Sequence, residues 1–179
     1  MNKKILWITQ SAVLLALLIV LQWVTKPMGQ LVTGSCVNAV LAVSTLFVGM
    51  GSGMTVALLS PIFAFALNIA PNVVTVPVIM VGNCVFVGVF SALRNGTWRK
   101  RILVLVIAAA AKFAVLYGLV QWVICGVAAP ALLQLGILKQ PMLKALPLSF
   151  GVMQLVTALL GGGVTLLIVP VLKKALKKS

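Results

Sequence analysis

Long apolar runs, separated by short polar or basic segments, are the feature of this chain that most restricts its fold. The first run extends from Ile5 to Val24 and contains no charged residue. About 20 apolar residues are enough for a helix to cross the hydrocarbon core of a bilayer. Because backbone groups in that core must satisfy their own hydrogen bonds, such runs predict membrane-spanning helices.

Six such runs predict an all-α integral membrane protein with six transmembrane helices in one bundle. The whole chain, 1–179, is expected to form a single membrane domain. The second and third spans, at about 16–18 residues each, are short for a bilayer, and a re-entrant hairpin is the alternative for them. Residues 129–147 are expected to form an outer loop with a short interfacial helix near residues 132–140. The predicted spans cover about residues 5–24, 33–50, 54–69, 73–93, 102–127 and 148–172.

The composition supports a membrane protein and excludes several kinds of chemistry. Apolar residues make up 63% of the chain and charged residues 8%, whereas about a quarter of the residues in a soluble domain are charged. Asp, Glu and His are absent, so the chain has no carboxylate pair, no Ser-His-Asp set and no carboxylate for a metal. We therefore expect no catalytic residue, no metal site and no cofactor. The apolar runs also leave no soluble basic face for nucleic acid.

The basic residues predict which end of the bundle faces the cytoplasm. If the N-terminus is inside, the inner segments hold ten Lys and Arg residues, and the outer loops hold three, which are Lys26, Lys139 and Lys144. Basic residues concentrate on the cytoplasmic side of membrane proteins. Both termini are therefore expected in the cytoplasm. The first run is expected to be a span, because the apolar core of a signal peptide has only about 7–15 residues.

The remaining basic residue, Lys112, lies about ten residues inside the fifth predicted span and hence near mid-membrane. A charged lysine at that depth costs about 2.5–3.5 kcal/mol to insert, and the chain has no acidic side chain to pair with it. Three interpretations are open. The amine snorkels to the inner headgroups or loses its proton on burial, it meets an anionic group of a ligand in a cavity, or it meets a carboxylate of a partner subunit.

Amides within the spans are further candidates for a binding site, because an amide inside a bilayer needs a partner. Asn83 lies near the middle of the apolar stretch Pro77–Leu93. Asn38 and Gln154 are expected nearer the outer side, and Gln30 in the first outer loop would close over a pocket between them. The alternative is that these amides only join helices through hydrogen bonds, which contribute about 0.6 kcal/mol on average.

Tyr117 and Gln121 complete the candidates, because they are four residues apart and share one face of the fifth span. Lys112 and Gln121 are separated by nine residues, which is about 180° around an ideal helix. They cannot both face one cavity unless the helix is distorted near Gly118. The candidate substrate-binding residues are Gln30, Asn38, Asn83, Lys112, Tyr117, Gln121 and Gln154.

Five short motifs occur in order along nearly the whole chain. They are TQSAVLLA at 9–16, VNAVL at 37–41, LSPIFAF at 59–65, VPVIMVGN at 76–83, and KF followed by LY within 112–117. Together they resemble the S component of energy-coupling factor (ECF) transporters, the substrate-capturing subunit of an ATP-driven vitamin importer. Six spans in 179 residues also fit that family.

The resemblance implies a substrate pocket near the outer face, capped by the first outer loop and lined by later spans. It implies that Ala12 and Ala16 lie on a small-residue face that docks on a membrane coupling subunit, with two ATPase subunits behind it. The chain would then not be an enzyme, and ATP would be used by its partners. It would reside in the lipid bilayer of the bacterial cytoplasmic membrane and topple there as it delivers a small vitamin-like molecule.

Two other classes of function are compatible with the same residues. A stand-alone secondary transporter or channel would need a titratable relay or an internal repeat, and Lys112 is the only candidate relay residue. In a structural subunit of a larger membrane complex, the amides would be helix-packing contacts and no ligand would bind. If a substrate exists, Lys112 favours an anionic one, and the absence of acidic residues disfavours a strongly cationic one.

Overall fold

Helices account for nearly all of the described chain. The structure, a computed structural model, describes residues 2–70, 72–94 and 97–176 and contains no strand over these ranges, which confirms the predicted all-α class. The longer helices are α1 (Lys3–Thr25), α2 (Gln30–Phe47), α3 (Met50–Ala66), α4 (Thr75–Phe90), α5 (Trp98–Gly118), α7 (Gln140–Phe150) and α8 (Val152–Leu176). The shorter elements are η1 (Lys26–Met28), η2 (Ser91–Arg94), the π-helix η3 (Leu119–Val127) and α6 (Ala129–Gln134).

Five helical segments are long and apolar enough to cross a membrane, judged by length and composition. They are Lys3–Met28, Gln30–Phe47, Thr75–Leu93, Trp98–Val127 and Gln140–Val171. The third predicted span, 54–69, corresponds to α3, which is apolar but has only 17 residues. The helices therefore support a multi-pass membrane protein, while the six-span count stays a prediction.

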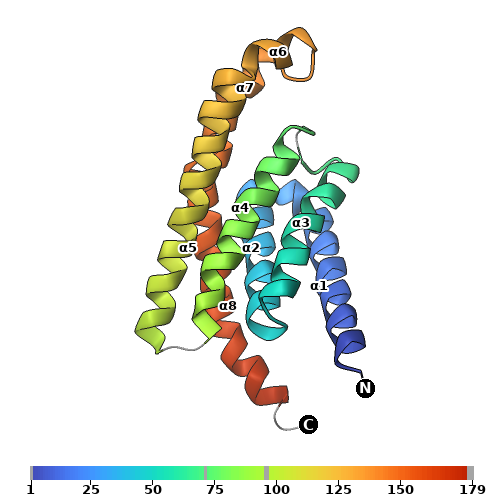
Figure 1. The fold of residues 1–179 in the computed structure, drawn as a ribbon, viewed down its shortest axis with the longest axis vertical. Helices are drawn as coiled ribbons and strands as arrows, with labels where there is room; N and C mark the ends of the chain where they lie inside the picture. Colours follow the sequence, from blue (N-terminus) through green and yellow to red (C-terminus); the bar gives the residue numbers. More distant parts are fainter. Residues whose placement is uncertain (1, 71, 95–96, 177–179) are drawn as a thin grey trace.

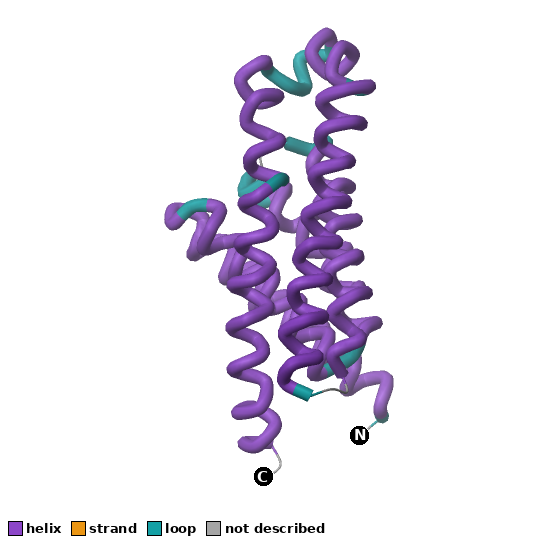
Figure 2. Tube along the Cα trace, turned by 90° about the vertical axis from the view of Figure 1, so that its left-hand side faces the viewer, coloured by secondary structure: helices purple, strands orange, loops and turns teal. Residues whose placement is uncertain are grey.

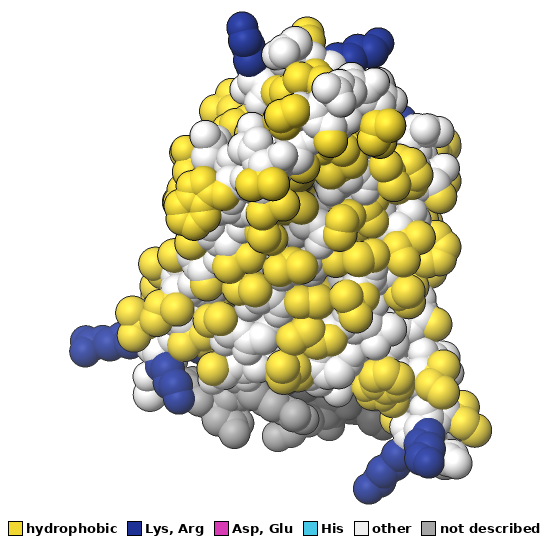
Figure 3. Space-filling model, turned by 45° about the horizontal axis from the view of Figure 1, so that its top comes forward, with side chains coloured by type: hydrophobic (Ala, Val, Ile, Leu, Met, Phe, Trp, Pro, Cys, Tyr) yellow, Lys and Arg dark blue, Asp and Glu magenta, His cyan; other side chains and the backbone are white. Residues whose placement is uncertain are grey.

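The helices stand side by side as an elongated bundle (Figures 1 and 2). The beginning of α1 and the end of α8 lie at the same end of this bundle, and α4 ends and α5 begins there too (Figure 1). In the face seen in Figure 3, hydrophobic side chains cover the middle and the visible Lys and Arg side chains lie toward the two ends. This is the distribution that a bilayer around the middle of the bundle requires.

Glycines form the turns that connect the first three helices. Gly29 follows η1 with φ at 85°, and Gly49 lies between α2 and α3 with φ at 130°. Side chains with a Cβ rarely adopt this backbone region, so glycine allows the chain to reverse within one or two residues. The short turns keep α1, α2 and α3 in contact with one another.

Close approach of helix backbones holds the two halves of the chain together. The most extensive helix pair is α2 with α8. At Gly161 of α8, a Cβ atom would lie 2.7 Å from Ala39 N and even closer to Ser35 O, so only glycine fits. Small residues at helix contacts are the usual basis of packing in membranes, where lipid replaces water as the solvent. This contact places α8 directly beside Asn38, whose Cβ would lie 2.8 Å from the added atom.

The expectation of a loop over residues 129–147 was wrong. Most of this segment is helical, as α6 and the first part of α7, and it lies at the end of the bundle opposite the termini (Figure 1). The segment contains three prolines. Pro130 and Pro141 are compatible with helix, because they occupy the first turns of α6 and α7, where a backbone N–H is not needed, and Pro147 lies inside α7. Leu146 and Phe150 of α7 pack with Leu116 in a second apolar cluster.

Candidate ligand-binding pocket

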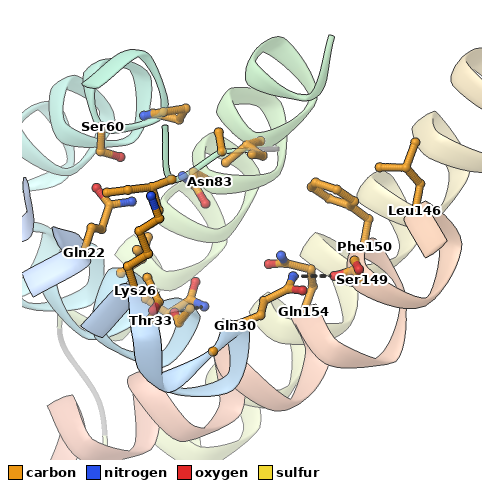
Figure 4. A pocket seen from close by; sticks show the side chains of 18 of the residues that line it. Gln22, Lys26, Gln30, Thr33, Ser60, Asn83, Leu146, Ser149, Phe150 and Gln154 are labelled. Carbon is orange, nitrogen blue, oxygen red and sulfur yellow. Dashed lines mark hydrogen bonds between the residues drawn. The ribbon is translucent and has the colours of Figure 1, made fainter. Parts of the chain in front are cut away.

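A cavity of about 400 Å³ lies between the helices, and residues of η1, α2 and α7 are among those that line it. Pockets for small molecules typically measure roughly 300–1,000 Å³, so this one suits a small ligand. Side chains from well-separated parts of the sequence surround the same space (Figure 4). The polar residues that line it are Gln22, Lys26, Gln30, Thr33, Asn38, Ser60, Asn83, Lys112, Ser149 and Gln154.

Lys112 lines this cavity with a side chain that is only 2% exposed. Its Nζ donates one hydrogen bond of 2.7 Å to Asn38 Oδ1 and another of 2.8 Å to Asn83 Oδ1. Nζ also lies 5.6 Å from the centroid of the Phe86 ring, at the distance of a cation–π contact. An ammonium group has three N–H donors, so these two amides leave one of them for another acceptor.

Asn38 is oriented by its neighbours on α2 and α8. Its Nδ2 donates to Gly34 O at 2.9 Å and to Thr157 Oγ1 at 3.3 Å. The Thr157 hydroxyl in turn donates to Gln154 O at 3.2 Å. Since the amide nitrogen is held in this way, the amide oxygen is the atom that faces Lys112.

Asn83 is brought to Lys112 by a close contact between α4 and α5. The preceding residue is Gly82, where a Cβ atom would lie 2.5 Å from Leu116 Cγ. The missing side chain therefore lets α5 approach α4, and Leu116 follows Lys112 by about one helical turn. Asn83 is 1% exposed, and among the described residues its amide oxygen has a hydrogen-bond partner while its amide nitrogen has none.

Three buried polar atoms around the cavity have no hydrogen-bond partner within the described residues. They are Gln22 Oε1, Ser60 Oγ and Asn83 Nδ2, from α1, α3 and α4, and all three residues line the cavity. Buried polar groups are nearly always paired, and an unpaired one costs about 1–3 kcal/mol. Residues that carry unpaired donors and acceptors and line one cavity are expected at a site for a polar ligand.

The mouth of the cavity is closed on one side by a contact between distant segments. Gln30 Nε2, at the start of α2, donates a 2.7 Å hydrogen bond to Ser149 O of α7, drawn as a dashed line in Figure 4. Lys26 of η1 is exposed and lines the same cavity. The first connecting segment thus contributes a polar, positively charged rim.

The cavity brings together five of the seven candidate binding residues, which are Gln30, Asn38, Asn83, Lys112 and Gln154. Tyr117, 42% exposed, and Gln121, also exposed, do not line it. The helix does change at Gly118, where α5 passes into the π-helix η3. The change of winding nevertheless leaves Gln121 on the outside of the bundle.

Sequence reasoning missed several residues of the cavity. Gln22 and Ser60 were not candidates, although each is a polar side chain within an apolar run. The signal that would have found them is the rule already applied to Asn38 and Asn83, that a polar group inside a span needs a partner.

The position of Lys112 Nζ excludes one interpretation of this residue and leaves open a neutral buried amine, an anionic ligand group and a partner carboxylate. Snorkelling is wrong for this structure, because Nζ is held between Asn38 and Asn83 and does not extend to the surface. A carboxylate of a partner subunit would have to enter the cavity to reach it. An anionic group of a small molecule meets no such obstacle.

Ala12 and Ala16 lie on the outside of the bundle. Both are exposed on α1, whereas Ser11 beside them is 5% exposed and faces the other helices. Both alanine side chains are therefore accessible from outside the bundle.

Comparison with known proteins adds no relative, since no protein-family model, curated protein or solved structure matches this chain.

Proposed function

We propose that this chain is the substrate-binding membrane subunit of an ATP-driven importer of the ECF type. It would capture a small vitamin-like molecule at the outer face of a bacterial cytoplasmic membrane and deliver it through a coupling subunit. The observation that carries the proposal is a cavity lined by Lys112 and by the three residues that each carry an unpaired, buried polar atom.

The place of the cavity supports capture from outside. Residues of η1, of the first turn of α2 and of α7 line it, and α7 lies toward the end of the bundle opposite the termini, which would be the outer side if both termini are cytoplasmic (Figure 1). Lys26, Gly29 and Gln30 of the first connecting segment line it, and a cap from this segment is what the resemblance to S components implies. Gln30 would act as a latch through its hydrogen bond to α7.

The exposed alanines of α1 support docking on a membrane partner. Small side chains four residues apart allow the backbone of another helix to approach closely, and Ala12 and Ala16 are both exposed. The partner would be the coupling subunit, and two ATPase subunits bound to it would supply the energy. The chain itself would hydrolyse nothing and carry no cofactor.

The proposal is tested by gentle purification of the tagged, full-length chain from its native membrane, followed by mass spectrometry of the proteins that come with it. A coupling subunit and a pair of ATPases are expected to co-purify with the wild type. The double variant Ala12→Trp/Ala16→Trp should lose them and should lose ATP-dependent uptake, because the indole rings prevent close helix approach. Ligand capture by this variant should stay intact.

A matched control separates docking from general damage by tryptophan. Ala110 and Ala114 of α5 are also exposed and also four residues apart, so Ala110→Trp/Ala114→Trp places the same bulk on a different face. This control should keep its ATPases. Wild-type protein that carries no ATPase above the level of an untagged sample, yet supports uptake, would identify a stand-alone transporter. Equal ATPase recovery from both double variants would remove Ala12 and Ala16 from the docking surface.

A further inference from the structure

We propose that the inner end of the cavity is a carboxylate site, so that the captured molecule is a small, mainly apolar, water-soluble carboxylic acid. Its carboxylate would lie against Lys112 and Asn83, and its body would extend toward the rim. This inference rests on the proposed function, because it specifies the chemical class of the molecule that the subunit captures.

A protonated Lys112 finds no opposite charge within the chain. No Asp or Glu occurs in the sequence, and the acceptors of Lys112 Nζ are two neutral amide oxygens. Taking an ion out of water costs several kcal/mol unless an opposite charge is close. Since Lys112 is 2% exposed and lines the cavity, a compensating anion reaches it through that cavity.

Two donors lie side by side at this inner end. One is the remaining N–H of Lys112 Nζ. The other is Asn83 Nδ2, which has no partner among the described residues and is bonded to the same carbon as the oxygen that accepts from Lys112. A carboxylate has two acceptor oxygens on one carbon, so one such group would satisfy both donors and neutralise the charge.

A phosphate fits this inner end less well than a carboxylate. Phosphate sites are typically built from Arg side chains, helix N-termini or several cations. Among the described residues that line the cavity, the cations are Lys112 at its buried side and Lys26 at its exposed rim. One ammonium beside one amide matches a single negative charge.

The other residues that line the cavity indicate the chemistry of the rest of the ligand. Gln22 Oε1 is an unpaired acceptor and the Ser60 hydroxyl is unpaired, so the ligand is expected to offer an N–H or O–H group to them. Ile79, Leu146 and Phe150 supply apolar surface for its body. The polar rim at Lys26 and Gln30 favours entry from water over entry of a lipid from the bilayer.

The test uses full-length protein in nanodiscs, incubated with the aqueous small-molecule extract of bacterial cells after removal of lipids into chloroform. Bound molecules are released and identified by mass spectrometry. Coupling with aniline and a carbodiimide adds a known mass to carboxylates, and phosphatase treatment removes the phosphate of phosphate esters. The variants are Lys112→Met, Lys112→Arg and, as a control, Lys144→Met, because Lys144 is an exposed cation of α7 outside the cavity.

We expect at least one molecule that is enriched on wild type and on Lys144→Met, reacts with aniline, and is at least tenfold less enriched on Lys112→Met. Lys112→Arg should retain part of the binding. If Lys112→Met does not fold, Asn83→Leu, which keeps the lysine, should reduce capture of the same molecule.

The other outcomes distinguish failure of this inference from failure of the proposed function. A captured molecule without a carboxylate, a phosphatase-sensitive one, or one that Lys112→Met retains fully would overturn the carboxylate site and leave substrate capture standing. A parallel incubation uses the chloroform-soluble lipids in place of the aqueous extract, and enrichment from these lipids alone would identify a lipid ligand and overturn the inference. No enrichment on wild type above empty nanodiscs would overturn the capture function and the carboxylate site together.

Discussion

Two polar clusters are buried in this bundle, and they differ in how completely their hydrogen bonds are made. In the first, Ser52 Oγ lies 2.8 Å from both Ser11 Oγ and Ser44 Oγ, so α1, α2 and α3 meet at three hydroxyls. The second cluster surrounds Lys112. Its side chains are buried to a similar degree, yet Asn83 Nδ2 has no partner within the described residues.

The difference shows what burial alone does not say about a polar residue in a membrane helix. The three serines satisfy one another, so their cluster joins helices and needs nothing from outside. The cluster at Lys112 is incomplete and adjoins a cavity, so a ligand would complete it. Buried polar groups whose hydrogen bonds are all made therefore join helices, whereas buried polar groups that lack a partner are candidates for binding a ligand.

The largest effect on stability and ligand capture is expected at Gly161, because this residue packs against the segment of α2 that carries Asn38. Gly161→Val would push α8 away from Ser35 and Ala39 of α2 and displace Asn38. Overpacking a tight contact costs about 1–3 kcal/mol or more, so thermal stability and ligand capture should both fall. Gly163→Val is the control, because a Cβ there would meet nothing within 4 Å. Equal thermal melting of the two variants would contradict the close α2–α8 contact.

Lys112→Met should separate binding from stability. Hydrogen bonds to charged groups contribute about 1.5–3 kcal/mol, so affinity for the captured molecule should fall about 10- to 100-fold. The unliganded variant should melt at the same temperature or higher, because removal of a buried, unmatched charge offsets the two hydrogen bonds that are lost. Calorimetric titration and thermal unfolding measure the two quantities. A marked loss of stability with unchanged affinity would make Lys112 a structural residue like the serines.

Much of the fold follows from the sequence, because the apolar runs are long and helices are the structure available to them in a bilayer. The positions of Asn38, Asn83 and Lys112 within these runs also suggested a shared site, since each is a polar group without a local partner. Their meeting at 2.7 and 2.8 Å depends on Gly82 and Gly161, which set the distance between helices. The distance between two helices cannot be deduced from the spacing of residues within one apolar run.

The parts that sequence reasoning did not reach have identifiable physical causes. The direction that Gln121 faces could not be predicted, because η3 is a π-helix and the rotation per residue of an ideal α-helix does not apply there. The wall formed by α7 was missed, because proline in the first turn of a helix looks like a loop signal when the helix start is unknown. The cluster of Ser11, Ser44 and Ser52 could not be predicted, because serine is common in membrane helices and these positions show no pattern that would bring them together.

At the three serines, a smaller effect is expected, and it should change stability without changing ligand capture. Ser52→Ala removes the hydroxyl that contacts both Ser11 and Ser44. Such interhelical hydrogen bonds contribute about 0.6 kcal/mol on average and about 1.7 at most, so stability should fall slightly and capture should not change. Ser35→Ala is a suitable control, because within the described residues the Ser35 hydroxyl bonds to Leu31 O of its own helix and to no other helix. Loss of capture in Ser52→Ala would show that the two clusters are coupled.

The smallest effect is expected at the rim, where Lys26 is exposed and its charge is screened by water and salt. An exposed ion pair contributes about 0–1 kcal/mol, so Lys26→Gln should leave the dissociation rate of the captured molecule nearly unchanged. Its association rate should fall a few-fold at low ionic strength, since a cation beside the mouth attracts an anion before contact. Lys139→Gln is the control, as Lys139 is exposed near the start of α7 and does not line the cavity. Stopped-flow binding at two salt concentrations measures the association and dissociation rates of the captured molecule for both variants. An equal effect of both variants would assign the attraction to the net charge of the protein, whereas an effect of Lys26→Gln on dissociation would place this residue in the bound complex.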